Sequence, residues 1–287
     1  MSSYQDLWYR SGDGLRLYAR DYAGPGGGDG EPVVLCMHGL TRNSADFSGL
    51  AESLSDRYRV LCVDQRGRGR SDYDKVTANY TPAVYVRDMF TLLDGLDVPS
   101  AILVGTSMGG LMSMIMCAMQ PQRIRGAVLN DIGPEVDSRG LERIQGYVGK
   151  SKPVSSWEEA VVQQKAINGI AFPDFSEAEW WDFTRGLYRD ADGTPVIAYD
   201  AAIAEPMADE DSGAVPPDLW PLFESIAGTP MLVLRGESSD ILSPQCVARM
   251  RELKGDLQVA TIPHRGHAPT LNEPGSRRAI EAFLAAL

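Results

Sequence analysis

The pentapeptide Gly105-Thr106-Ser107-Met108-Gly109 has the composition of a turn that presents a nucleophile. It comes directly after the apolar run 101–104 and directly before the apolar segment 110–119, which predicts a strand, a sharp turn and a helix. The glycines on either side of the serine tolerate strained dihedrals and a close contact between helix and strand. A serine hydroxyl on such a turn projects clear of the sheet, so Ser107 is a candidate nucleophile.

A serine attacks a carbonyl only when a base removes its proton, and the sequence has three histidines that could do so. His267 lies just past a predicted strand at 257–262 and follows a glycine that frees its loop. An imidazole can accept and return a proton near neutral pH, so His267 is the candidate general base. His264, nearer the strand, is the rival candidate. His38 ends another predicted strand and is expected to be structural.

Carboxylates follow two other predicted strands and could orient the imidazole. Asp240 follows the strand 231–234 through a short loop that also contains Glu237, and Asp131 ends the preceding strand. Such an acid fixes the imidazole tautomer and stabilises the imidazolium. Ligands of an open α/β sheet bind beyond the carboxyl ends of its strands, so these groups are expected near Ser107.

The composition narrows the class of partner. The chain has 287 residues, 44% hydrophobic content and a formal charge of −12. The electrostatic field of this negative charge repels nucleic acid and anionic membranes, so we expect neither as a partner. The first twenty residues contain no apolar leader segment and no stretch is long enough to span a membrane, which predicts a cytoplasmic protein. The four cysteines form no disulfide framework or zinc spacing, and we expect no metal and no cofactor.

The elements that must position these residues alternate along most of the chain. A hairpin is predicted over residues 5–22, turned at Gly12-Asp13-Gly14. From residue 33 onward, short β-rich runs alternate with helical segments, which indicates a parallel sheet with crossover helices. The alternation stops after residue 134 and resumes at residue 231. The predicted helices of this interval are Leu141–Val148, Ser156–Asn168, Ser176–Tyr188 and Pro217–Ile226.

These motifs together resemble the α/β-hydrolase family, and the resemblance covers essentially the whole chain. The segment Asp64-Gln65-Arg66-Gly67-Arg68-Gly69-Arg70-Ser71 is similar to a structural loop of that family. The resemblance implies an α/β fold with a mostly parallel eight-stranded sheet flanked by helices. It also implies a core domain formed by residues 1–134 and 218–287, and an inserted helical cap at residues 135–217.

The resemblance also assigns roles to single residues. Asp240 matches the usual place of the family's acid, and Asp131 the place that some relatives use instead. The family supplies two backbone N–H groups to the oxyanion, and its motifs place them at Leu40 and Met108. A serine at the nucleophile position argues against epoxide hydrolases and haloalkane dehalogenases, which have aspartate there.

Four of the five tryptophans lie between residues 135 and 230, in or directly after the predicted cap. Trp157, Trp180, Trp181 and Trp220 either line an apolar pocket or join the cap to the core. We predict that Trp157 and Trp181 bind substrate, together with Thr106 on the nucleophile turn.

We therefore predict a carboxylesterase that acts on small to medium esters, as a monomer or homodimer. A second hypothesis is a carbon–carbon hydrolase of meta-cleavage products, with Arg185 or Arg189 of the cap binding the substrate carboxylate. Thr106 and Ala268 count against it, since those enzymes usually have Asn before the serine and Trp after the histidine. An enol-lactonase and a non-catalytic binding protein of the same fold are the remaining hypotheses.

Overall fold

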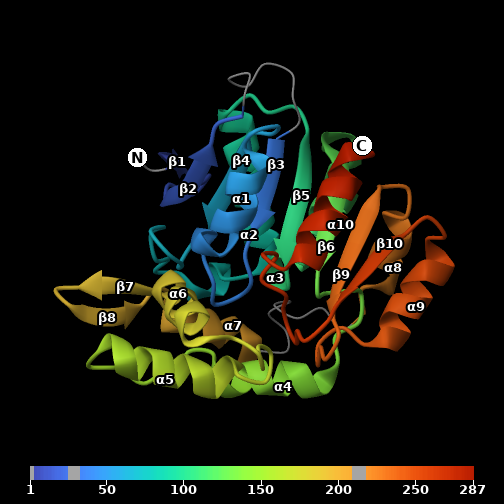
Figure 1. The fold of residues 1–287 in the computed structure, drawn as a ribbon. Coiled ribbons are helices and arrows are strands. Elements are labelled where there is room, and N and C mark those ends of the chain that lie inside the picture. The colour runs from blue at the N-terminus through green and yellow to red at the C-terminus, as the bar shows by residue number, and fades with distance from the viewer. Residues whose placement is uncertain (1–2, 25–32, 209–217) are drawn as a thin grey trace.

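The computed structural model describes residues 3–24, 33–208 and 218–287. Its chain begins with the predicted hairpin, in which β1 (Gln5–Arg10) pairs antiparallel with β2 (Arg16–Tyr22). The hairpin lies at one edge of the main sheet (Figure 1). Strand β2 then pairs antiparallel with the first strand of the parallel part.

The main sheet has eight strands in the order β1-β2-β4-β3-β5-β6-β9-β10, and all neighbours from β4 to β10 are parallel. The strands β3 to β6 and β9 are buried along nearly their whole length, because helices cover both faces of the sheet. This is the mostly parallel α/β sheet that the sequence predicts. The parallel strands are β3 (Val33–Met37), β4 (Val60–Asp64), β5 (Ala101–Thr106), β6 (Ile124–Asn130), β9 (Met231–Gly236) and β10 (Gln258–Ile262).

Two hydrophobic cores lie between this sheet and its helices. One face packs against α1 (Ser48–Leu54) and α10 (Pro274–Ala285), which lie side by side in front of the sheet in Figure 1. The opposite core contains side chains of four further helices. These are α2 (Pro82–Gly95), α3 (Met108–Met119), α8 (Trp220–Ser225) and α9 (Pro244–Leu253).

A helical insertion, residues 138–208, follows β6 and lies beyond one end of the sheet (Figure 1). Ser156 and Ser176 cap two of its helices, because their hydroxyls accept the backbone N–H groups of Glu159 and Glu179. The predicted helix at 217–226 forms from residue 220 as α8, and Pro217, with the predicted end of the cap, lies outside the described residues. The helices of the insertion are α4 (Ser138–Tyr147), α5 (Trp157–Asn168), α6 (Glu177–Leu187) and α7 (Glu205–Ala208).

The insertion also contains a small hairpin that the sequence prediction misses. Strand β7 (Tyr188–Ala191) pairs antiparallel with β8 (Thr194–Ile197) through the two-residue turn Asp192-Gly193. Both turn residues have positive φ, 52° and 86°, as a type I′ turn requires. An Asp-Gly pair is typical of this turn, so the signal is present in the sequence.

The loop after β4 ties distant elements together through a buried arginine. The Arg66 guanidinium binds the carboxylates of Asp13, Asp74 and Asp88 at 2.8, 2.6 and 2.8 Å. Its hydrogen bonds hold the pKa of Asp13 at about 2. The ion pairs join the N-terminal hairpin to α2, and they explain why this loop carries a charged residue in the protein interior.

Candidate active site

The turn between β5 and α3 has the predicted form. Ser107 joins the strand to the helix with φ 52° and ψ −114°, a strained conformation for a non-glycine residue. A Cβ atom on Gly105 would lie 2.2 Å from the carbonyl oxygen of Gly109, and one on Gly109 would lie 2.0 Å from that of Met37. Only glycine fits at either position, so the two glycines allow the helix to start directly against the sheet.

Ser107 and His267 lie within hydrogen-bonding distance, and Asp131 completes the series. Ser107 Oγ is 2.8 Å from His267 Nε2, and His267 Nδ1 is 2.8 Å from Asp131 Oδ2. Asp131 is fully buried and the imidazole is nearly so. His264 is exposed and contributes its backbone N–H to Glu237, so neither His264 nor Glu237 reaches the serine.

Asp131 is held in place by several donors. Its Oδ1 accepts the N–H of Gly236 at 2.7 Å, and its Oδ2 accepts the Ser239 hydroxyl at 2.5 Å in addition to the imidazole. The residue follows β6 with φ 58°. This left-handed conformation ends the strand and turns the side chain toward the loop after β9. The carboxylate is therefore fixed before any substrate binds.

Asp240 does not contact His267, which contradicts the prediction that it orients the imidazole. Arg143 of α4 binds its carboxylate through two hydrogen bonds, Nε to Oδ2 at 2.5 Å and Nη2 to Oδ1 at 2.9 Å. Burial opposes ionisation of Asp240, but the Arg143 guanidinium outweighs it and holds the pKa of this carboxyl below its usual value. Asp240 therefore joins the insertion to the core, and Asp131 stands where the prediction put Asp240.

The two predicted oxyanion residues lie in the segments that follow β3 and β5. Met108 is the first residue of α3, so its N–H has no carbonyl partner within the helix. Leu40 lines the cavity beside Ser107. His38 is fully buried, its Nδ1 lies 2.7 Å from the Gly39 carbonyl oxygen and its Nε2 accepts the N–H of Gln65. Burial lowers the pKa of His38 to about 3, so the ring is neutral and structural, as expected.

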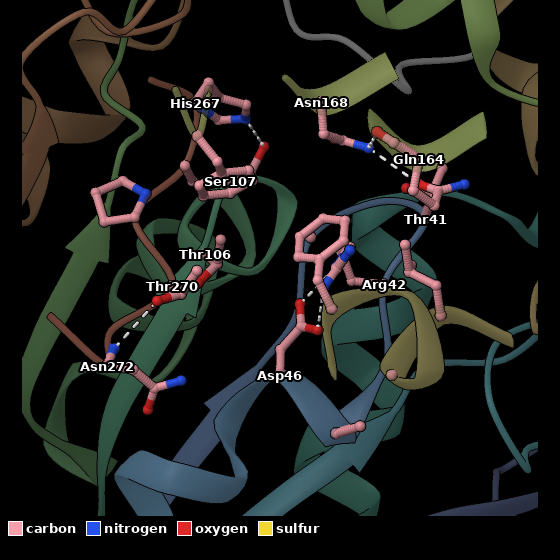
Figure 2. A pocket seen from close by; sticks show the side chains of 18 of the residues that line it. Thr41, Arg42, Asp46, Thr106, Ser107, Gln164, Asn168, His267, Thr270 and Asn272 are labelled. Atoms are coloured by element: carbon pink, nitrogen blue, oxygen red, sulfur yellow. Dashed lines mark hydrogen bonds and ion pairs between the residues drawn. The ribbon is translucent and has the colours of Figure 1, made fainter. Parts of the chain in front are cut away.

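A cavity of about 500 Å³ opens at Ser107 between the sheet and the insertion. Figure 2 shows His267 and Ser107 on one side, with Thr41, Arg42, Gln164 and Asn168 on the other. Thr106 lines this cavity as predicted. Its aromatic wall consists of phenylalanines and tyrosines, namely Phe47, Tyr147, Phe172, Phe175, Phe183 and Tyr199.

The predicted tryptophans do not form that wall. Trp157 packs edge-on against Tyr188, and Trp181 lies beside the Arg185 guanidinium. Neither lines the cavity. The prediction of Trp157 and Trp181 as substrate-binding residues therefore disagrees with the structure. Other residues of the same two helices line the cavity, namely Gln164, Ile167 and Asn168 of α5 and, among those of α6, Phe183.

Asn130 is a site residue that sequence reasoning missed. Its fully buried side-chain amide donates to Thr106 Oγ1 at 3.0 Å and to the Pro269 carbonyl at 2.8 Å. The backbone carbonyl of Asn130 accepts the N–H of Ser107. It thus connects the nucleophile turn to the loop that carries His267. Only its place at a strand end could have suggested this role.

The described residues contain neither a metal-binding cluster nor a membrane-spanning helix. No group of three or more histidine, cysteine, aspartate or glutamate side chains within them could hold a metal ion. No helix in the same part of the chain has both the length and the apolar character needed to cross a membrane.

Comparison with known proteins agrees with this architecture. Residues 32–168 match the family described as alpha/beta hydrolase fold. A 3-hydroxybutyrate-oligomer hydrolase of Cupriavidus necator is 34% identical over 84% of this chain and 84% of that protein. A 2-(acetamidomethylene)succinate hydrolase of Mesorhizobium japonicum is 31% identical over 82% and 81%. The crystal structure of an α/β hydrolase from Novosphingobium aromaticivorans has a TM-score of 0.94 and 42% identity, with both chains fully covered. The chain therefore belongs to the α/β-hydrolase family and is a hydrolase.

Proposed function

We propose that this protein is a serine hydrolase of carboxylic esters. Ser107 is the nucleophile, His267 the general base and Asp131 the group that orients the base. The observation that supports the proposal most is the pair of 2.8 Å contacts joining Ser107 Oγ, the two imidazole nitrogens and Asp131 Oδ2. A ligand-binding protein without catalysis has no need of this alignment.

The proton positions follow from the acceptors. A carboxylate only accepts, so His267 Nδ1 carries the proton that faces Asp131, and Nε2 is free to accept one from Ser107. As the serine oxygen forms its bond to the ester carbonyl carbon, its proton moves to Nε2. The same proton then passes to the leaving alkoxide as the carbon–oxygen bond breaks. Water then attacks the acyl-enzyme carbonyl and gives its proton to Nε2. The proton passes to Ser107 Oγ as the acyl–oxygen bond breaks and the carboxylic acid leaves.

The tetrahedral intermediate carries a negative oxygen that needs donors already in place. The N–H groups of Leu40 and Met108 are the candidates, because Leu40 lines the same cavity as Ser107, and Met108 follows Ser107 at a helix start that leaves its N–H free. Loss of one such donor costs about 10²–10³ in kcat in a comparable serine hydrolase. These two groups therefore supply a large share of the proposed catalysis.

The cavity supports a neutral substrate of small to medium size. Its two arginines are already paired: Arg42 donates twice to Asp46, and Arg265 binds Glu273 and Asp174. Apolar and aromatic side chains make up much of the remaining wall, and burial of apolar groups against them contributes about 25 cal/mol per Å². We further propose that the insertion predicted at residues 135–217 is a cap, since residues of its described part, such as Tyr147, Gln164 and Phe183, line this cavity. Because the chain is similar to the 3-hydroxybutyrate-oligomer hydrolase of Cupriavidus necator, esters of short hydroxy acids are the first substrates to test.

The arrangement of charges disfavours a carbon–carbon hydrolase that uses arginines of the cap. Arg185 lies over the Trp181 ring at 5.3 Å and Arg189 over the Tyr73 ring at 5.9 Å, and both are exposed. Neither lines the cavity at Ser107. A dienoate carboxylate bound near the serine would therefore find neither guanidinium.

A substrate comparison tests this preference. Neutral p-nitrophenyl esters with acyl chains of two to six carbons are expected to have a higher kcat/KM than any dienoate meta-cleavage product. Arg185→Ala and Arg189→Ala are expected to leave the ester kcat/KM within about tenfold, which is about 1.4 kcal/mol of transition-state stabilisation. A dienoate that reacts faster than every ester, and loses that activity in either variant, would favour the carbon–carbon hydrolase.

A further inference from the structure

Arg68 is a fully buried cation without an acidic partner. It lies two residues after Arg66 in the loop after β4, and both side chains are almost completely inaccessible. Arg66 binds three carboxylates, whereas no carboxylate oxygen of the described residues lies within 4.0 Å of the Arg68 guanidinium. A buried charge costs several kcal/mol when no opposite charge compensates it. The position of Arg68 therefore requires an explanation.

The hydrogen bonds of Arg68 are satisfied by neutral groups. Its Nη1 donates to the carbonyl of Arg66 and to the hydroxyl of Tyr85, both at 2.8 Å, and its guanidinium lies 4.9 Å from the Tyr85 ring centroid. Burial raises the pKa of Tyr85, so this phenol stays neutral. The guanidinium also lies 5.6 Å from the Tyr80 ring, whose hydroxyl donates to Asp200 Oδ2 at 2.7 Å. Neutral groups therefore orient the guanidinium, and no carboxylate of the described residues bonds to it directly.

The remaining contacts of Arg68 reach both residues of the proposed oxyanion hole. Its Nε donates to the carbonyl of Leu40 at 2.9 Å, and its Nη2 lies 3.9 Å from the sulfur of Met108. Leu40 and Met108 come from different segments of the chain, after β3 and after β5. A single side chain thus joins the two halves of the hole from behind.

We propose that Arg68 is a positioning residue that fixes Leu40 and Met108 as oxyanion donors and adds a positive charge behind them that no carboxylate bonds directly. The inference rests on the proposed serine hydrolase activity. The bound ester is neutral, whereas the tetrahedral intermediate carries a negative oxygen. A fixed positive charge in a low-dielectric interior therefore stabilises the intermediate more than the substrate. The effect belongs in kcat and leaves KM nearly unchanged.

Substitutions that separate charge from contact test this proposal. Arg68→Met removes the charge and the hydrogen bonds, Arg68→Gln removes the charge and keeps a donor, and Arg68→Lys keeps the charge. Arg70→Met is the matched control, because Arg70 belongs to the same loop but is half exposed and paired with Asp6. Titration with a fluorophosphonate gives the fraction of active sites in each preparation, so that kcat is expressed per active site.

Both neutral variants are expected to lower kcat per active site by about 10–10², less than the loss of a direct oxyanion donor. KM should stay within about twofold, and the Ki of a trifluoromethyl ketone, which forms an anionic tetrahedral adduct, should rise in parallel with the loss of kcat. Arg68→Lys should recover most of the activity, and Arg70→Met should match the wild type. Gln serves as the neutral variant if Met prevents folding.

Two results would overturn the inference. The first is a neutral variant with wild-type kcat per active site, so that the damage appears only as a smaller fraction of active sites or a lower Tm. The second is Arg68→Lys as slow as Arg68→Met, which would show that the charge has no part. A wild-type protein that neither reacts with the fluorophosphonate nor cleaves esters would instead refute the proposed function itself.

Discussion

Replacing Ser107 by alanine is expected to lower ester kcat by about 10⁶, the loss seen when the nucleophile of a serine hydrolase is removed. The reason is that the acyl-enzyme bond forms at Oγ, and no neighbouring group can take its place. Residual turnover would come from the oxyanion donors and from binding alone. Initial rates on p-nitrophenyl butyrate, measured at high enzyme concentration, give the size of the effect.

Ser113→Ala is a matched control for this experiment. Ser113 lies in α3, the helix that follows Ser107. It is fully buried and donates its hydroxyl to the carbonyl of Gly109 at 2.9 Å. It has no contact with the candidate site residues His267 or Asp131. We expect its kcat to stay within about threefold of the wild type, a loss of under 1 kcal/mol. A Ser107→Ala protein that kept more than a hundredth of the activity would contradict the assignment.

The second large effect is expected at Asp131. Asp131→Asn should lower kcat by about 10⁴ with little change in KM. A neutral amide cannot stabilise the imidazolium, and with its oxygen held by the Gly236 N–H it turns its NH2 group toward Nδ1, which favours the wrong imidazole tautomer. The comparison is with Asp240→Asn, in which the same chemical change is made at the other carboxylate. Since Asp240 binds Arg143 and not the imidazole, its kcat should stay within about tenfold.

The two variants also differ in what they do to stability. Asp240→Asn weakens the ion pair between α4 and the loop after β9, so a lower Tm with nearly intact kcat is the expected pattern. In Asp131→Asn the donors Gly236 and Ser239 face a neutral amide, and the loss of kcat is expected to be larger than in Asp240→Asn. A crippled Asp240→Asn enzyme beside an active Asp131→Asn enzyme would restore the acid to the position predicted from sequence.

The core of the fold could be predicted because its signals are local. Buried parallel strands appear as continuous apolar runs. The glycines around Ser107 are required by contacts between residues close in sequence, such as that of Gly105 with Gly109. The candidate base followed from the same logic. His267 lies in the loop after a strand and follows a glycine, and the structure brings it to Ser107.

The acid could not be decided in this way. Strands β6 and β9 are neighbours, so Asp131 and Asp240 both end near the imidazole. The choice depends on the left-handed backbone of Asp131 and on Arg143, which approaches Asp240 from a helix 97 residues away in the sequence. Such a long-range contact leaves no local pattern.

The lining of the cavity was unpredictable for a similar reason. The insertion is rich in aromatic residues, and composition alone gives no direction for their side chains. Trp180 packs against Phe172 and Phe175, while the phenylalanines also face the cavity. Phe172 and Phe175 lie in the loop between α5 and α6, where no helical or strand period predicts the direction of a side chain.

Covalent labelling tests the central claim most directly. The wild-type protein is treated with a fluorophosphonate, its intact mass is measured, and the labelled peptide is identified by digestion and fragmentation. The proposal predicts one phosphonyl group per chain, attached to Ser107, with loss of ester turnover in proportion to labelling. It also predicts no label on the Ser107→Ala protein. A label on another serine, or an enzyme that stays unlabelled while it cleaves esters, would contradict the assignment of Ser107 as the nucleophile.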